Sequence, residues 1–146
     1  MRRGGLVTAG RYAWASTISV LGGLLVAAAL ASGGRASFVA GVLEAHGGVI
    51  AILLRYVVPL RGGASAMTLG HVVVGRDRDC LQRTRAHERI HVRQCERWGP
   101  LFVQAYVLAS LCAALQGRHY YRGNRFEREA NAATSGRMPR DSGFLL

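Results

Sequence analysis

The chain has 146 residues, of which 50% are hydrophobic, and its 19 basic residues outnumber its 8 acidic ones. This length allows one domain with an apolar core and excludes two domains of ordinary size. The net charge of +11 favours anionic surfaces such as membrane lipid. No aromatic–basic recognition motif accompanies the charge, so a specific nucleic-acid partner is not expected.

Every basic residue is an arginine, in a chain that is also rich in alanine and glycine. This composition is typical of GC-rich bacterial coding sequences. The three cysteines, Cys80, Cys95 and Cys112, cannot all pair within the chain and form no Cys-x-x-Cys clip. They are predicted to be buried free thiols, and they leave the redox compartment undecided.

The N-terminal region carries a long uncharged segment, Tyr12–Gly34, which is predicted to be a transmembrane helix. Arg2, Arg3 and Arg11 precede it, so the positive-inside rule places the N-terminus in the cytoplasm and the rest of the chain outside the bacterial cell membrane. A signal peptide cleaved near Ala29–Ala31 is the alternative. Both interpretations export the domain, but only the first tethers it.

The rest of the chain is predicted to fold as one α+β domain over residues 35–134, after the anchor at 1–34 and before a flexible tail at 135–146. Apolar patterning and Gly/Pro punctuation define its elements. They are a strand at 38–46, a helix at 49–60, a strand at 67–74, and helices at 80–98, 101–116 and 124–133. No internal repeat is present.

Capping signals set the starts of two of these helices. Asp79 with Gln82 suggests a capping box for the helix 80–98, and Asn124 with Glu127 suggests one for the last helix. The helix 101–116 carries no charge and is only about 22 Å long, which is short for a bilayer. It is therefore predicted to be a buried core helix, with a membrane-embedded position as the open alternative.

The motif His87-Glu88-Arg89-Ile90-His91 lies within the helix 80–98. Histidines four residues apart project from one helical face and can share a tetrahedral zinc ion. Glu88 would then lie beside the metal, where a general base takes a proton from activated water. An ordinary polar helix face is the alternative interpretation of the motif.

A third ligand is needed, and Glu127 is the best candidate because a helix starting there could pack antiparallel to the first. Cys95 is excluded, since it lies about 12 Å from His87 along a straight helix. Glu129 is the alternative, but it projects about 200° away from Glu127, so the two cannot both bind. The alternative interpretation is that Glu127 only caps its own helix.

Two further sets of polar residues are predicted to be exposed to solvent. Arg85, Arg89, Arg93 and Arg97 recur every four residues on the face opposite the histidines. We interpret this row as a solvated face, with contact to anionic lipid headgroups as the alternative. Glu44 and His46 share a face of the strand 38–46 and are predicted to be exposed to solvent, with a second polar site as the alternative.

The motif pair His87-Glu88-x-x-His91 and Glu127-x-x-Ala130-Asn131 resembles the gluzincin metallopeptidases over residues 67–134. The resemblance implies zinc bound by His87, His91 and Glu127, with Glu88 as general base in peptide-bond hydrolysis. It also implies that the strand 67–74 lines the cleft and pairs with an extended substrate. Asn131 departs from the family's usual aspartate, which weakens support for a ligand histidine.

An oxyanion-stabilising group is also expected, and the nearby candidates are His71, His119, Tyr120 and Tyr121, of which Tyr121 is preferred. The expected function is a membrane-anchored, zinc-dependent hydrolase acting on an unknown peptide or protein. The alternative is a zinc-binding but catalytically silent membrane module, because so short a chain leaves little material for substrate subsites.

Overall fold

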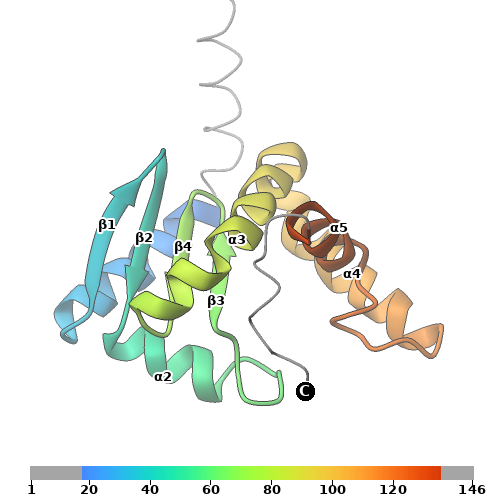
Figure 1. Ribbon diagram of the computed structural model, residues 1–146, viewed down its shortest axis with the longest axis horizontal. Helices are drawn as coiled ribbons and strands as arrows, with labels where there is room; N and C mark the ends of the chain where they lie inside the picture. Colours follow the sequence, from blue (N-terminus) through green and yellow to red (C-terminus); the bar gives the residue numbers. More distant parts are fainter. Residues whose placement is uncertain (1–17, 136–146) are drawn as a thin grey trace, which may run out of the picture.

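The computed structural model describes residues 18–135, which form a mixed α+β fold around a small four-stranded sheet (Figure 1). The strands are β1 (Arg35–Val39), β2 (Val42–His46), β3 (Ala66–Leu69) and β4 (Val72–Gly75), in the spatial order β1-β2-β4-β3. β2 and β4 are parallel, whereas both outer pairs are antiparallel. The α+β class predicted from the sequence is confirmed.

Each predicted strand is in fact a β-hairpin. A two-residue turn at Ala40–Gly41, with φ of 44° and 81°, separates β1 from β2, and positive φ at both positions matches the twist of a tight hairpin. Gly70, with φ of 66°, starts the second turn between Leu69 and Val72. The sequence predicts a single strand for each segment, because a turn only two residues long barely interrupts the β-compatible pattern.

The central strand β4 is buried on both faces. Val72 and Val74 lie in a hydrophobic cluster with Ile50 and Leu54 of α2 (Gly48–Tyr56). Val73 points the other way, into a second cluster with Leu81 and Val92 of α3 (Arg78–Trp98). Successive side chains of a strand alternate between faces, so three consecutive valines suit a strand between two helical layers.

The long helix α3 starts two residues earlier than predicted. Its N-cap is Asp77, whose carboxylate accepts a hydrogen bond of 2.7 Å from the Cys80 backbone N–H. The cap predicted at Asp79 is therefore wrong, because Asp79 lies inside the first turn. After α3 come a 3₁₀ turn (Gly99–Leu101), α4 (Phe102–Leu115) and α5 (Arg125–Thr134).

The predicted N-terminal span is covered only in part. Residues 1–17 lie outside the described residues, and so do residues 136–146 of the predicted tail. A short apolar helix, Ile18–Ala31, packs on the sheet through Val26 and Ala29. Within the described residues, one continuous helical stretch, Arg78–Leu115, is long and apolar enough to cross a membrane. Length and composition alone are weak evidence for a span, and they do not fix a topology. This stretch is not the N-terminal segment that the sequence pointed to.

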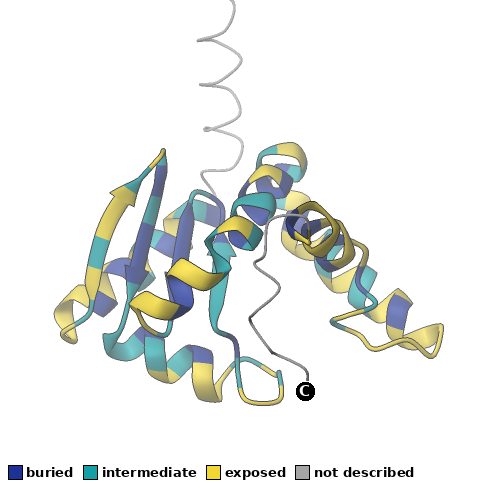
Figure 2. Ribbon diagram, in the orientation of Figure 1, coloured by how far each residue is buried: buried dark blue, intermediate teal, exposed yellow. Residues whose placement is uncertain are grey.

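The helix α4 is not a buried core helix, contrary to the prediction. Only Phe102 and Ala113 are buried along its length, and most of its other residues are exposed (Figure 2). Cys112 on this helix is exposed as well, whereas Cys80 and Cys95 are buried, as predicted. The absence of charge in a helix does not show which neighbouring elements will cover that helix. Here α3 and α5 contact α4 on one side only.

Glu44 is buried, not exposed as predicted. Its side chain points from β2 toward α3, where Arg85 holds both carboxylate oxygens at 2.9 and 2.8 Å. Arg89 contacts the same carboxylate at 3.4 Å and donates to the Ala40 carbonyl at 3.0 Å. The arginine row is therefore not simply a solvated face, because two of its members neutralise a buried charge.

Removing both partners of Glu44 should destabilise the fold strongly. In the double variant Arg85→Met/Arg89→Met the buried carboxylate loses its counter-charges, and we expect a loss of about 3 kcal/mol in the free energy of unfolding. Chemical denaturation of the purified protein measures it. Arg93→Met is the matched control, since Arg93 is exposed and forms no ion pair within the described part of the chain. A similar small change in both variants would contradict the assignment.

Candidate metal centre

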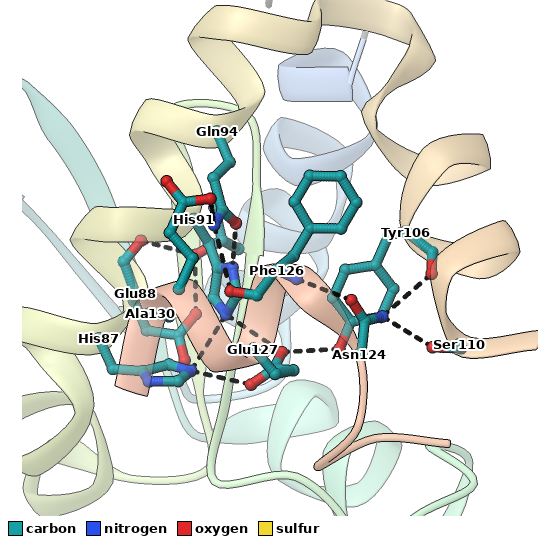
Figure 3. A network of polar contacts seen from close by, with 12 residues as sticks. His87, Glu88, His91, Gln94, Tyr106, Ser110, Asn124, Phe126, Glu127 and Ala130 are labelled. Atoms are coloured by element: carbon teal, nitrogen blue, oxygen red, sulfur yellow. Dashed lines mark hydrogen bonds and ion pairs between the residues drawn. The ribbon is translucent and has the colours of Figure 1, made fainter. Parts of the chain in front are cut away.

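Three side chains from two helices converge on one point. His87 and His91 project from α3, and Glu127 projects from the first turn of α5 (Figure 3). The Nε2 atoms of the two histidines are 3.0 Å apart. The Glu127 carboxylate lies 3.1 Å from His87 Nε2 through Oε2 and 3.2 Å from His91 Nε2 through Oε1.

This triangle has the size that a tetrahedral metal ion requires. Ligand atoms at about 2.0–2.1 Å from a zinc ion are about 3.3 Å from one another. The two Nε2 atoms are slightly closer than that, each lies just over 3 Å from a different oxygen of Glu127, and one ligand atom from each residue can be chosen with all three within 4.8 Å of one another. The group could therefore hold a metal ion. The three ligands predicted from the sequence are the ones that the fold brings together.

Local sequence explains why α5 places Glu127 here. The Asn124 side chain caps the helix by accepting from the Phe126 N–H at 2.9 Å, as the capping signal predicted. The same side chain donates to the Tyr106 carbonyl and to Ser110 Oγ on α4, at 3.0 and 2.8 Å. Asn124 thus fixes the start of α5 against α4, and Glu127 follows one turn later.

Gln94 orients one of the ligands, and the sequence analysis missed it. Its amide N–H groups donate to the Phe126 carbonyl and to Glu129, at 3.1 and 3.2 Å, so its oxygen must face His91. That oxygen lies 2.8 Å from His91 Nδ1, which therefore carries the proton. The Nε2 lone pair of the neutral ring is left for a metal. Gln94 follows His91 by three residues, and this helical spacing was the only available signal.

Replacing Gln94 should weaken the metal site without removing a ligand. A Gln94→Leu variant loses the hydrogen bond that sets the tautomer of His91, and a loss of about 10–100-fold in zinc affinity is expected. Competition with a zinc chelator of known affinity measures it. Gln82→Leu, on an exposed part of α3, is the control and should keep the parent affinity. Equal affinities for all three proteins would rule out this role.

Glu88 lies beside the centre but is not part of the triangle. It is 5% exposed, and one of its carboxylate oxygens accepts a hydrogen bond of 2.7 Å from Thr68 Oγ1 on the edge strand β3. Burial raises the pKa of Glu88, an effect that the nearby His91 and His87 and the Thr68 hydrogen bond partly offset. A carboxyl group with a raised pKa is suited to exchange protons near neutral pH.

Tyrosines surround the third ligand. Tyr106 of α4, which the sequence analysis did not single out, donates a hydrogen bond of 2.6 Å to Glu127 Oε1. Tyr121 is also close to this carboxylate: burial, followed by the charge of Glu127, raises the pKa of its hydroxyl. The preferred oxyanion candidate therefore lies near the centre.

The other oxyanion candidates have different partners. His71 pairs with Glu96 at 3.1 Å, and the Tyr120 hydroxyl donates to the Pro59 carbonyl at 2.6 Å. His119 is exposed and stacks on Tyr120. Glu129, the alternative ligand, instead pairs with Arg97 at 2.8 Å, which agrees with the opposite orientation expected from its helical position.

Comparisons of this chain with protein-family models, with curated proteins and with solved structures gave no match. The chemistry of the centre therefore has to be inferred from its own residues. Two imidazoles and a carboxylate form a ligand set that zinc accepts, and three protein ligands leave a fourth position open. His87, with 15% of its side chain exposed, is the most open of the three ligands.

The protonation of the centre predicts how zinc affinity depends on pH. Without metal, burial lowers the pKa of His91, but the hydrogen bond and charge of Glu127 outweigh it and raise the pKa above 6.5. Burial likewise opposes ionisation of Glu127, but its hydrogen bonds to both histidines hold its pKa well below 4.5. The protonated His91 therefore stabilises the metal-free fold below pH 6.5, and this contribution is lost as the pH rises through its raised pKa.

Zinc binds the neutral imidazole. The affinity of the site for zinc should therefore rise with pH, whereas the stabilising contribution of protonated His91 falls. We expect affinity to rise by about tenfold per pH unit until His91 has lost its proton, and then to level off. Zinc titrations between about pH 5.5 and 8 would reveal this slope. An affinity independent of pH over this range would show that His91 is not a ligand.

Proposed function

We propose that this protein is a membrane-anchored, zinc-dependent peptidase with a minimal zincin-like domain. The observation that carries the proposal is the convergence of His87, His91 and Glu127 with the buried carboxylate of Glu88 beside them. A zinc ion bound there would lower the pKa of a coordinated water toward neutrality and polarise a scissile carbonyl.

The protein's own residues would perform the proton transfers. Glu88 accepts a proton from the attacking water and passes it to the leaving amine, and its raised pKa suits both steps. Tyr121, close to Glu127, would donate a hydrogen bond to the carbonyl oxygen as negative charge develops.

The position of β3 is consistent with binding of an extended peptide. This strand is at the edge of the sheet and packs against α3, and its Thr68 contacts Glu88 directly. No strand of the described chain pairs with its outer edge. An extended peptide could add there as a further strand, with its backbone running past the metal centre.

The membrane part of the proposal rests on the uncharged segment Tyr12–Gly34 and on the arginines that precede it. They favour an N-terminal membrane anchor with the metal centre outside the cell membrane, and the described part of this segment, Ile18–Ala31, lies against the sheet through Val26 and Ala29.

The test is metal analysis of the full chain purified in detergent, followed by a cleavage assay on a mixed peptide library. We expect one zinc per chain, cleavage that stops when zinc is removed by a chelator, and recovery when zinc is restored. A parent protein without bound metal would overturn the proposal. One tightly bound zinc without cleavage of any peptide would instead identify the silent zinc-binding module.

A further inference from the structure

The helix α4 and the residue before it, Leu101, present a largely apolar face that the described fold leaves uncovered. Its large exposed side chains are between 48% and 79% accessible: Leu101, Val103, Val107, Leu108, Leu111 and Leu115. Gln104 is the polar, exposed exception among them. At 100° per residue they occupy about half of the helical circumference. The opposite half, with Phe102, Tyr106 and Ala113, faces the protein, where Phe102 and Tyr106 contact Phe126 of α5. A helix that is apolar on its outer side needs an apolar environment there.

The charges around α4 have one sign. The twenty residues 98–117 are uncharged, with Arg97 before them and Arg118 after them. No acidic residue occurs between Glu96 and Glu127, whereas Arg118 and Arg122 are exposed in the loop that follows α4 and Arg125 is exposed at the start of α5. An apolar face edged only by positive charge matches a bilayer with anionic headgroups.

The chain segment that follows α4 indicates how this helix would lie relative to a membrane. The chain turns back after Leu115, and Asn124 is hydrogen-bonded to Tyr106 and Ser110 in the middle of α4. The start of α5 is therefore held beside the centre of α4, on its protein-facing side, so both ends of α4 belong to the same side of a membrane. This geometry fits a helix lying along the membrane surface and not one that crosses it (Figure 1).

We propose that α4 lies in the interfacial layer of an anionic lipid bilayer, with its apolar face among the acyl chains and Arg118 and Arg122 at the headgroups. This is a second membrane contact, separate from the N-terminal segment. It holds the metal centre at the membrane surface, because Tyr106 of α4 is hydrogen-bonded to Glu127. If the proposed peptidase function holds, the substrates are polypeptide segments lying at or emerging from the bilayer.

The exposed Cys112 of α4 provides the test, because Cys80 and Cys95 are buried and should not react in the folded protein. The full chain is labelled at Cys112 with an environment-sensitive fluorophore and reconstituted into vesicles of phosphatidylcholine and phosphatidylglycerol at a ratio of about three to one. We expect a blue-shifted emission, and quenching by spin labels placed at a shallow depth in the lipid. The spectrum should be the same with and without zinc, so the result does not depend on the proposed activity.

Variants separate insertion of α4 from simple tethering. Leu108→Glu/Leu111→Glu should return the probe to a water-like spectrum while the chain stays bound to the vesicles and keeps its zinc content. Gln82→Glu on the exposed side of α3 should leave the spectrum blue-shifted. Arg118→Gln should lower the equilibrium constant for insertion by about fivefold, as expected for the loss of one arginine at an anionic surface.

Two outcomes would overturn the proposal. A water-like spectrum in vesicle-bound parent protein would show that only the N-terminal segment holds the chain. A blue shift without quenching by lipid spin labels, together with oxidative disulfide cross-linking of Cys112 between two chains of the unlabelled protein, would show that a second copy covers α4.

Discussion

A Glu88→Gln variant is expected to keep its bound zinc and to lose peptide cleavage, with kcat falling by about 10²–10⁴-fold. Glutamine has nearly the same size as glutamate and can still accept the hydrogen bond from Thr68, so the local packing should survive. It cannot accept a proton from water. The loss should therefore appear in kcat with little change in KM, because the substitution removes a proton-transfer step and leaves the peptide-binding surface intact.

The measurement compares initial cleavage rates and metal content for the parent and the variant. Glu96→Gln, on the same helix but paired with His71, is the control and should retain activity within a few-fold. Parent-like cleavage by Glu88→Gln would contradict its role as general base. If the variant lost both its zinc and its activity, Glu88 would be needed for the structure of the metal site and would not be shown to transfer protons.

The second large effect concerns the ligands themselves. His91→Ala and Glu127→Ala each leave two ligands and an incompletely paired buried group, and we expect zinc affinity to fall by more than about 100-fold, beyond the loss typical of a supporting residue. Isothermal titration or chelator competition on metal-free protein measures the change. Near-UV circular dichroism shows whether each variant remains folded.

Glu129→Ala is the matched control for the third ligand. Glu129 lies two residues from Glu127 on α5, but it points toward Arg97 and should change zinc affinity only slightly. If Glu129→Ala abolished binding and Glu127→Ala did not, the ligand assignment would be reversed. Equal retention of zinc by all three variants would show that the ion binds elsewhere.

The candidate ligands could be named from the sequence because their relations within each helix follow from local rules, although the meeting of Glu127 with His87 depends on packing across 40 residues. Four-residue spacing on a helix fixes the relative position of His87 and His91. The capping signal at Asn124 fixed the start of α5 and therefore the direction of Glu127 relative to Glu129. Such relations depend only on backbone geometry within one element, which the sequence specifies well.

The supporting residues could not be found in this way. Thr68 reaches Glu88 from a strand 20 residues earlier, and Tyr106 reaches Glu127 from 21 residues earlier. Glu44 receives Arg85 across 41 residues. Each contact depends on how two elements pack, and threonine, tyrosine and glutamate are common enough that their presence carries no signal before the packing is known.

The sequence by itself determined the helices, the α+β class and the three candidate ligands, because helical spacing and end-capping act over a few residues. The tertiary structure decided that α4 has an uncovered face and that the arginine row holds a buried carboxylate. It also placed the buried Glu88 beside the ligands. Burial is a property of neighbours brought together from distant parts of the chain, and neither hydropathy nor charge along the sequence specifies those neighbours.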